Sequence, residues 1–412
     1  MQGRRAGIDW TGEVECVPLT IALDAAGGDH APVETVRGAA QAVEELGVRV
    51  LLVGPAAAIE RELDRSKAVR RGLTASLEVV PAEETISMDE SPAVAVRSKR
   101  NSPPVVAARL VRDGHASGFV SAGSTGAALA ASLFVLGRIE GIDRPALATT
   151  FPTVSGHCLL LDIGANVDCR PGFLAQFAVM GSLYSERVLG VHQPRVGLLS
   201  IGEEETKGNQ LSLEAYSLIK PLKLNFVGNV EGKDIPTGLA DVVVSDGFVG
   251  NVVLKLAEGM ASLAFHIIRT EAKKRPLAML GALLMRPAFR GVRQRIDYEE
   301  YGGAPLLGVR GVAIVAHGRS KARAIRNAIR VARDAAESEL VRHIAEGIAA
   351  APEIAAHSRR TRQATSADAN GPSGSVSVED VEDIKESPGE QGRQAEIGIG
   401  GSGIQLSRQG ED

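Results

Sequence analysis

The sequence predicts an α/β fold with a doubly wound, mostly parallel sheet and a protruding amphipathic helical hairpin. Short apolar runs of strand length alternate with segments of helical periodicity from about residue 20 to residue 348. Two of these runs open the segments LLLDIGANVDCRP (159–171) and GLLSIGEEETKGN (197–209) without polar alternation, which is typical of parallel strands covered on both faces. The connections are short and rich in glycine, as is usual in such folds.

The amino-terminal half contains four predicted strands, at residues 20–23, 49–53, 77–80 and 118–120. The first strand runs into DAAGGDHAP, where Gly27 and Gly28 permit backbone conformations closed to other residues and Pro32 fits the first turn of a helix. That helix carries Val36 and Val43 on one face. Further helices are predicted at residues 91–99, at residues 105–113 and after the loop SAGSTGA (121–127).

The carboxyl-terminal half repeats the alternation. Strands are predicted at residues 146–150, at the start of each of the two central segments, at 224–227, at 240–244 and, as closing strands, within 306–315. Helices are predicted at residues 173–189, after the loop SDGFVGN (245–251), and as one long helix over 319–348.

Residues 276–296 depart from this rhythm. Their apolar stripe consists of Leu277, Leu280, Leu284, Phe289 and Val292, with Arg290 and Arg293 on other faces. Pro287 interrupts the stripe, so the pattern predicts two short amphipathic helices that form a hairpin. Such a hairpin suits either dimerisation or contact with an anionic surface, of lipid or of an acidic protein.

The α/β domain is expected to span residues 19–350. Residues 1–18 show no sustained period and are predicted to form a flexible extension. Residues 351–412 are rich in Ser, Gly, Glu and Gln with few large apolar residues, so they are predicted to form a disordered tail.

Several classes of protein are disfavoured by composition and motif. The formal net charge of -4 gives no global reason to expect a nucleic-acid partner, and three cysteines without paired spacing favour a reducing compartment. The sequence shows no signal peptide and no transmembrane run, so a cytoplasmic location is expected. It also lacks a Walker loop, a zinc-ligand pattern and a serine-nucleophile elbow, so no cofactor or metal is expected.

Polar residues gather where the predicted strands end. Those after the two central strands are Asp162, Asn166, Asp168, Glu203, Glu204, Glu205 and Lys207. Because ligands of parallel sheets bind beyond the carboxyl ends of the strands, these groups are expected at one edge. The loops 121–127 and 245–251 open onto helix N-termini and are predicted to bind phosphate at the same edge. His317, between a strand and a helix, could orient or protonate a leaving group or serve as a structural cap.

At these positions the sequence resembles the bacterial phosphate acyltransferase family of phospholipid synthesis. The motifs that carry the resemblance include LDAAGGDHAP, VSAGSTGA, LLDIGANVDCRP, RVGLLSIGEEETKGN, ADVVVSDGFVGNVVLK and YGGAPLLG, which occur in family order between about residues 20 and 336. The family's pattern has other residues at the positions of Ala26, Ser124 and Lys321, and Lys321 argues against a catalytic carboxylate at that place.

The resemblance implies a Rossmann-like fold similar to phosphotransacetylases and isocitrate-dehydrogenase-like proteins. It implies transfer of an acyl group from acyl-[acyl carrier protein] to inorganic phosphate, forming acyl phosphate for a glycerol-3-phosphate acyltransferase that uses acyl phosphate. It also implies a cytosolic homodimer that associates peripherally with the inner face of the plasma membrane. The alternatives are a short-chain phosphotransacylase that uses acyl-CoA and a non-catalytic membrane scaffold for lipid-synthesis enzymes.

Roles for individual residues follow as hypotheses. Lys207 and the N–H groups of Ser124, Thr125 and Gly126 would hold phosphate, Asn166 or Asn251 would face the carbonyl oxygen, and Asp168 or Asp246 would take a proton or fix Lys207. Further binding residues are expected at Gly27, Gly28, Asp29, Glu203, Glu205 and Gly247. Membrane or carrier-protein contact is expected at Leu280, Leu284, Phe289, Arg290 and Arg293.

Overall fold

The computed structural model of the chain describes residues 18–66, 72–87, 89–296 and 302–354. Almost all of the predicted amino-terminal extension and most of the predicted tail lie outside these residues. The hydrophobic core continues past the expected boundary at residue 350, because Ala351 and Ile354 are both buried in it.

Within the described residues the strands form one sheet, in the order β3-β2-β1-β4-β11-β10-β5-β6-β9-β7-β8. The strands are β1 Thr20–Asp24, β2 Arg49–Gly54, β3 Leu77–Pro81, β4 Gly118–Ser121, β5 Ala146–Thr153, β6 Gly156–Leu161, β7 Arg195–Leu199, β8 Asn225–Val230, β9 Val242–Val244, β10 Ala304–Leu307 and β11 Val312–Val315. The predicted α/β class with a mostly parallel sheet is confirmed.

The sheet consists of two parallel halves that run in opposite directions. Strands β3, β2, β1, β4 and β11 are parallel to one another, as are β6, β9, β7 and β8. Between the halves, β10 is antiparallel to β11 and to β5, and β5 is antiparallel to β6. The expectation that the loops 121–127 and 245–251 share one sheet edge is therefore wrong, since β4 and β9 belong to opposed halves.

The register nevertheless brings the carboxyl ends of both halves to the same level. Val315, the last residue of β11, pairs with Ala304 of β10. Leu306 of β10 pairs antiparallel with Leu147 of β5, so Ala304, two residues earlier, lies level with Thr149. Leu161, the last residue of β6, pairs with Ala148. The two halves are thus staggered along β10 and β5, and their terminal loops converge near residues 147–149.

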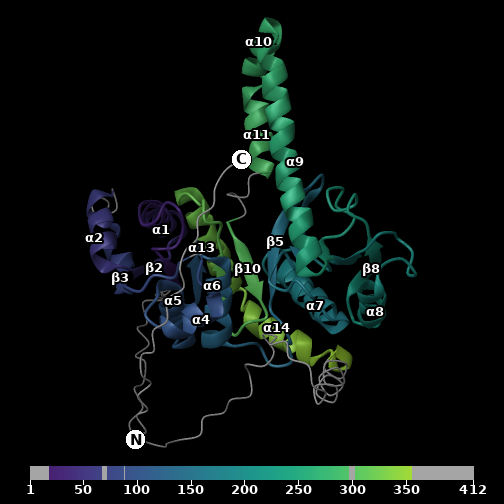
Figure 1. Cartoon of the computed structure of the whole chain (residues 1–412), viewed down its shortest axis with the longest axis horizontal. Helices are drawn as coiled ribbons and strands as arrows, with labels where there is room; N and C mark the ends of the chain where they lie inside the picture. The colour runs from purple at the N-terminus through teal and green to yellow at the C-terminus, as the bar shows by residue number, and fades with distance from the viewer. Residues whose placement is uncertain (1–17, 67–71, 88, 297–301, 355–412) are drawn as a thin grey trace, which may run out of the picture. The chain divides into compact units, whose positions relative to one another are not determined.

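Helices cover both faces of the sheet (Figure 1). They are α1 Val33–Leu46, α2 Ala56–Arg65, the 3₁₀ turn η1 Leu73–Ser76, α4 Pro92–Ser98, α5 Pro103–Arg112, α6 Thr125–Ala131 with the π-helical turn η2 Ser132–Leu136, α7 Pro171–Arg187, α8 Gln210–Ile219, α9 Gly247–Lys273, α10 Pro276–Leu284, α11 Arg286–Ile296, α13 Ala322–Glu337 and α14 Leu340–Ala349.

Alternate residues of the strands enter two separate cores. Ile21 and Leu23 pack with residues of α1, α7, α13 and α14, whereas Ala22 packs with residues of α4, α5 and α6 on the opposite face. This two-sided burial explains why the strands lack polar alternation. It also confirms the doubly wound arrangement.

The single long helix predicted over residues 319–348 is wrong. The chain forms α13 and α14, separated at Ser338 and Glu339. Glu339 has a φ of 49°, a left-handed conformation that cannot continue a right-handed helix. The break redirects α14 so that Leu340 and Ile344 are buried in the core, and α14 packs against α7.

The hairpin also differs from its prediction. Residues 276–296 do form two helices, α10 and α11, divided at Met285, with Pro287 in the first turn of α11. However, the first arm of the hairpin is the 27-residue α9, against which α10 packs (Figure 1). Of the described helices, α9 is the one long and apolar enough to cross a membrane. Its first turns, however, belong to the domain, where Gly247 and Gly250 are buried.

A close approach of α1 to α13 generates a prediction about stability. A Cβ on Gly38 would lie 2.6 Å from Cβ of Ile325 and 2.7 Å from the carbonyl oxygen of Ala322. Gly38→Ala should therefore lower the free energy of unfolding by about 1–3 kcal/mol through overpacking. Gly259→Ala is the matched control, because nothing lies within 4 Å of a Cβ there and alanine favours a helix by roughly 0.5–1 kcal/mol. Urea unfolding measures both, and equal effects of the two substitutions would contradict the packing argument.

Candidate active site

A cavity of about 1130 Å³ lies where the two half-sheets meet. One half contributes the loops after β1, β4 and β11, which bring Asp29, Gly123 and His317 to its wall. The other half contributes Gly164 after β6 and a face of α9 that begins at Asn251. Strand β5 runs between them, with Leu147 and residues 149–153 lining the cavity. The stagger of the sheet thus creates the site.

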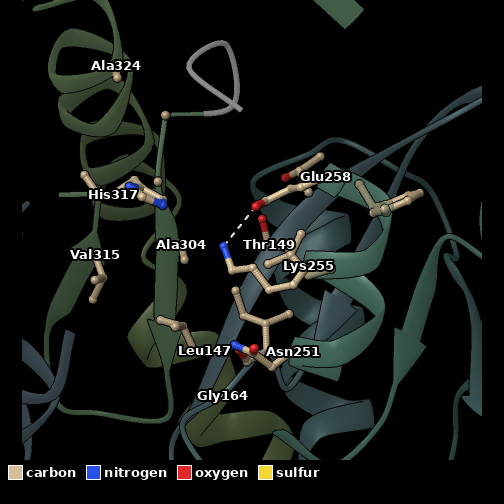
Figure 2. A pocket seen from close by; sticks show the side chains of 18 of the residues that line it. Leu147, Thr149, Gly164, Asn251, Lys255, Glu258, Ala304, Val315, His317 and Ala324 are labelled. Carbon is tan, nitrogen blue, oxygen red and sulfur yellow. Dashed lines mark hydrogen bonds and ion pairs between the residues drawn. The ribbon is translucent and has the colours of Figure 1, made fainter. Parts of the chain in front are cut away.

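Helix α9 contributes two of the charged groups that line the cavity, and Asp29 and Arg319 of the other half contribute two more. Lys255 and Glu258 form an ion pair with Nζ 3.0 Å from Oε2, and both line the cavity (Figure 2). Together with Asn251 they follow the spacing i, i+4, i+7, which places them on one face of the helix. Nδ2 of Asn251 donates to the carbonyl oxygen of Ile163 at 2.9 Å, and this hydrogen bond fixes the side chain.

His317 provides a neutral polar group on the opposite wall. The backbone N–H of Arg319 donates to Nδ1 at 3.2 Å, so the neutral ring carries its proton on Nε2. Burial, together with the positive charges of Lys255 and Arg319, lowers the pKa of His317. The imidazole is therefore uncharged near pH 7 and serves as a hydrogen-bond donor through Nε2.

A buried carboxylate, Asp24, supports the two glycine loops of the first half. Oγ of Ser121 donates to Oδ2 of Asp24 at 2.7 Å, and the backbone N–H of Ala26 donates to Oδ1 at 3.2 Å. Oγ of Ser121 in turn accepts from the backbone N–H of Gly123. A Cβ at Gly27 would lie 2.5 Å from Oδ2 of Asp24 and 2.7 Å from the backbone nitrogen of Gly123, so the loops pack too closely for any side chain there.

Asp162 supports the loop of the second half in the same way. Its oxygens accept the backbone N–H groups of Leu147, Gly164, Ala165 and Asn166 at 2.7–3.2 Å. The side-chain amide of Asn166 donates to Asp162 and to the carbonyl oxygen of Pro145, both at 2.8 Å. Both N–H groups of that amide are therefore engaged within the loop.

The cavity gathers some of the residues predicted from the sequence. Those that line it are Asp29, Thr125, Asn251 and His317. Those that do not line it are Gly27, Gly28, Ser124, Gly126, Asn166, Asp168, Glu203, Glu205, Lys207, Asp246 and Gly247. Ser124 and Asp246 instead cap α6 and α9, accepting from the backbone N–H groups of Ala127 and Val249. Gly247 packs against the backbone of Asn166 and donates to its carbonyl oxygen at 2.8 Å.

The loop after β7 occupies the same sheet edge as the loop after β6, as predicted, because both strands are parallel to β9. Its acidic residues pair with lysines outside the cavity: Glu205 with Lys220 at 2.7 Å and Glu203 with Lys233 at 3.7 Å. Lys207 is exposed, and its carbonyl oxygen accepts from Oγ of Ser200 at 3.0 Å. The role predicted for its ammonium group stays a prediction.

Three carboxylates of this loop and of the segment after β8 lie close enough to one another to hold a cation. They are Glu203, Glu231 and Asp234, all outside the cavity. Lys233 pairs with both glutamates and partly neutralises them.

The hairpin residues predicted for contact lie in α10 and α11. Leu284 is 75% exposed at the end of α10. Phe289 and Arg290 lie in α11. The side chains of Leu280 and Arg293 lie outside the described part of the chain.

Sequence reasoning missed Lys255 and Glu258. Both follow the loop SDGFVGN at helical spacing from Asn251, and that spacing was the available signal. A lysine and a glutamate on a long helix are ordinarily solvent-exposed. Their place in the cavity depends on the half-sheet opposite them.

Comparisons with known proteins give the fold first. The chain superimposes on a phosphotransacetylase from Streptococcus pyogenes with a TM-score of 0.53 and 16% identity, over 78% of this chain and 94% of that one. The fold is therefore that of the phosphotransacetylases, as the sequence predicted.

Sequence comparison then gives the family. Residues 19–343 match the model of the family described as "Fatty acid synthesis protein", and the chain belongs to this family. It is 57% identical over 330 residues to a phosphate acyltransferase of Heliobacterium modesticaldum, covering 80% of this chain and 98% of that protein. It is 54% identical over 330 residues to a phosphate acyltransferase of Pelotomaculum thermopropionicum, covering 80% and 95%. The resemblance stated from the motifs is confirmed.

The buried carboxylate of Asp24 generates a prediction about pH. Burial raises the pKa of Asp24 to about 6, and hydrogen bonds from Ser121, Gly27 and Ala26 oppose this only in part. Between about pH 4 and pH 6 the folded protein thus holds a proton that the unfolded chain has released, so this group's contribution to stability falls as pH rises. The total change is about 3 kcal/mol.

Asp24→Asn removes this titration. The free energy of unfolding of the wild type minus that of the variant should decrease from pH 4 to pH 6.5 and stay level above pH 7. Chemical denaturation at a series of pH values measures the difference. A difference that does not vary with pH would show that Asp24 titrates normally.

Proposed function

We propose that the protein is a phosphate acyltransferase that moves a long-chain acyl group from acyl-[acyl carrier protein] to inorganic phosphate. The observation that carries the proposal is the composition of the cavity, which combines cationic and neutral hydrogen-bond donors with an apolar wall along α9 and β5. Phosphate fits the first part and an acyl group the second. The relatives named phosphate acyltransferase support the same reaction.

Phosphate binds between the glycine loop of the first half and Lys255. Gly123 and Thr125 line the cavity at the start of α6, where backbone N–H groups without helical partners can donate hydrogen bonds to an anion. The ammonium group of Lys255, which is paired with Glu258, adds a cationic donor inside the cavity, and His317 adds its Nε2–H.

The acyl thioester carbonyl lies against Asn251. One N–H of its amide is held by Ile163, and the amide has a second N–H with which to stabilise the developing oxyanion. An oxygen of hydrogen phosphate attacks the carbonyl carbon, the new C–O bond forms and the C–S bond breaks. The phosphate proton ends on the sulfur of the released carrier thiol. No covalent enzyme intermediate is needed, because phosphate is the nucleophile.

The acyl donor and the fate of the product follow from the proposed reaction. The acyl carrier protein is acidic, so Arg319, which lines the cavity, would steer it electrostatically. A short-chain transacylase that uses acyl-CoA would need little of the apolar wall. The acyl phosphate formed is a substrate for an acyl-phosphate:glycerol-3-phosphate acyltransferase, and the reaction belongs to the cytoplasmic face of the membrane.

The long hairpin is proposed to serve both dimerisation and membrane contact. On α9, Leu256, Met260, Leu263 and Ile267 are each about half exposed or more, and their 4-3-4 spacing is that of a helix packed against another helix. At the far end of the hairpin, Leu277 and Leu284 of α10 are 85% and 75% exposed. Lys274 and Arg275 lie just before Leu277 in the chain. Apolar residues flanked by cations suit an anionic bilayer surface.

The reaction is tested by supplying palmitoyl-[acyl carrier protein] and phosphate, following release of the carrier thiol and trapping acyl phosphate as its hydroxamate. Lys255→Ala should lower kcat/KM by roughly 100-fold, with a raised KM for phosphate, because the cavity loses its ammonium group. Lys223→Ala is the matched control, since Lys223 is exposed and does not line the cavity.

Lys207→Ala tests the assignment made from the sequence. A fall in kcat/KM as large as that of Lys255→Ala would mean that both lysines reach phosphate during the reaction. Wild-type activity of Lys207→Ala would mean that Lys255 alone has that role. An unchanged KM for phosphate in Lys255→Ala would refute the proposed phosphate site. Turnover with acyl-CoA but not with the carrier thioester would support the short-chain transacylase, and no turnover with either would support the scaffold.

Two pairs of substitutions separate the proposed roles of the hairpin. Leu263→Glu with Ile267→Glu should convert a dimer to a monomer in sedimentation velocity, because it places four charges in a helix–helix contact. Leu283→Glu with Leu284→Glu should leave the dimer intact and weaken pelleting with phosphatidylglycerol vesicles by at least roughly tenfold. A monomeric wild type would exclude the dimer, and unaltered vesicle binding by the second variant would exclude the tip as the contact.

A further inference from the structure

The apolar part of the cavity has a defined wall on α9. Leu254, Ala257 and Ala261 line it at the spacing i, i+3, i+7, which is one face of the helix. Phe151, Pro152 and Val154, from the end of β5 and the turn after it, line the same cavity, as does Val292 of α11. Two small alanines thus stand where larger side chains would fill the space.

This wall has a direction and a length. Asn251, against which the acyl carbonyl is proposed to lie, precedes Ala257 by six residues and Ala261 by ten. At 1.5 Å per residue, the two alanines lie about 9 Å and about 15 Å along the helix axis from Asn251. A two-carbon acetyl group would reach neither, whereas a long acyl chain whose carbonyl lies at Asn251 would pass both.

The lining of the cavity on α9 ends at Ala261. Ala257 and Ala261 are half-buried, whereas Ala264 is exposed and does not line the cavity. Alanine 264 therefore offers the same substitution on the same helix, less than one turn beyond Ala261, without entering the apolar space.

We propose that the acyl chain of the substrate lies along Leu254, Ala257 and Ala261, and that Ala261 determines how long a chain the enzyme accepts. This inference rests on the proposed function and adds the position of the chain and its limit. A phenylalanine at position 261 closes the channel beyond the reach of a short chain, and a phenylalanine at position 257 closes it nearer the carbonyl.

The experiment compares octanoyl and palmitoyl thioesters of the acyl carrier protein in the full-length protein. Ala261→Phe should lower kcat/KM for the palmitoyl substrate by about tenfold or more while leaving the octanoyl substrate within about twofold. Ala257→Phe should lower both. Ala264→Phe should resemble the wild type with both substrates, and thermal unfolding should confirm that each variant is folded.

A readout independent of turnover separates this inference from the proposed function. Binding of cis-parinaric acid, a fluorescent long-chain fatty acid, should weaken in Ala261→Phe and not in Ala264→Phe. If the wild type transfers no acyl group to phosphate, the proposed function fails, and this binding difference alone decides whether the channel exists. A folded Ala261→Phe variant that keeps its palmitoyl activity, or that loses octanoyl and palmitoyl activity equally, would overturn the inference.

Discussion

The structure depends on the way in which two opposed half-sheets are joined. Strands β10 and β5 each pair antiparallel with both neighbours, which lets one half run up and the other run down within a continuous sheet. Because the halves are staggered, loops that would otherwise point to opposite edges converge near residues 147–149. Each half then contributes what parallel strands ordinarily offer at their carboxyl ends: a glycine loop at a helix N-terminus from one side, and a long helix with charged side chains from the other.

Two buried carboxylates hold these loops in place. Asp24 fixes the glycine loops of the first half through Ser121 and backbone N–H groups, and Asp162 fixes the loop that positions Asn251. Neither lines the cavity, so their contribution is to preorganise groups that do. This arrangement explains why so many carboxylates and amides follow the strands in the sequence while so few reach the site. Asn166 and Asp246 serve as loop and helix supports in the same sense.

Most elements of the fold, and about half of the site, could be predicted from the sequence. Apolar runs, glycine turns and helical periodicity located nearly every strand, because each depends on local composition. The reversal of direction at β10 and β5 could not be predicted, since the pairing that joins the halves, Leu306 with Leu147, is between residues 159 positions apart. The same limit applies to Lys255 and Glu258: their periodicity showed which helix face they share, but only the sheet showed that this face borders a cavity. Asn251 and His317 were predicted because they lie close behind a strand, Asn251 in the first turns of α9 after β9 and His317 in the loop after β11.

Helix α9 connects the cavity with the end of the hairpin as one continuous rod. Its only buried residues, Gly247 and Gly250, are at its base, where the absence of side chains lets it rest directly on the loop of Asp162 and Asn166. Ala261 lies eleven residues above Gly250 and Lys273 lies twenty-three above it, so a tilt about that base moves the far end about twice as far as the cavity wall. The buried base of α9 at Gly247 and Gly250 is the point about which such a tilt would turn. A rigid-body tilt of α9 about this base would therefore displace the cavity wall about half as far as the end of the hairpin.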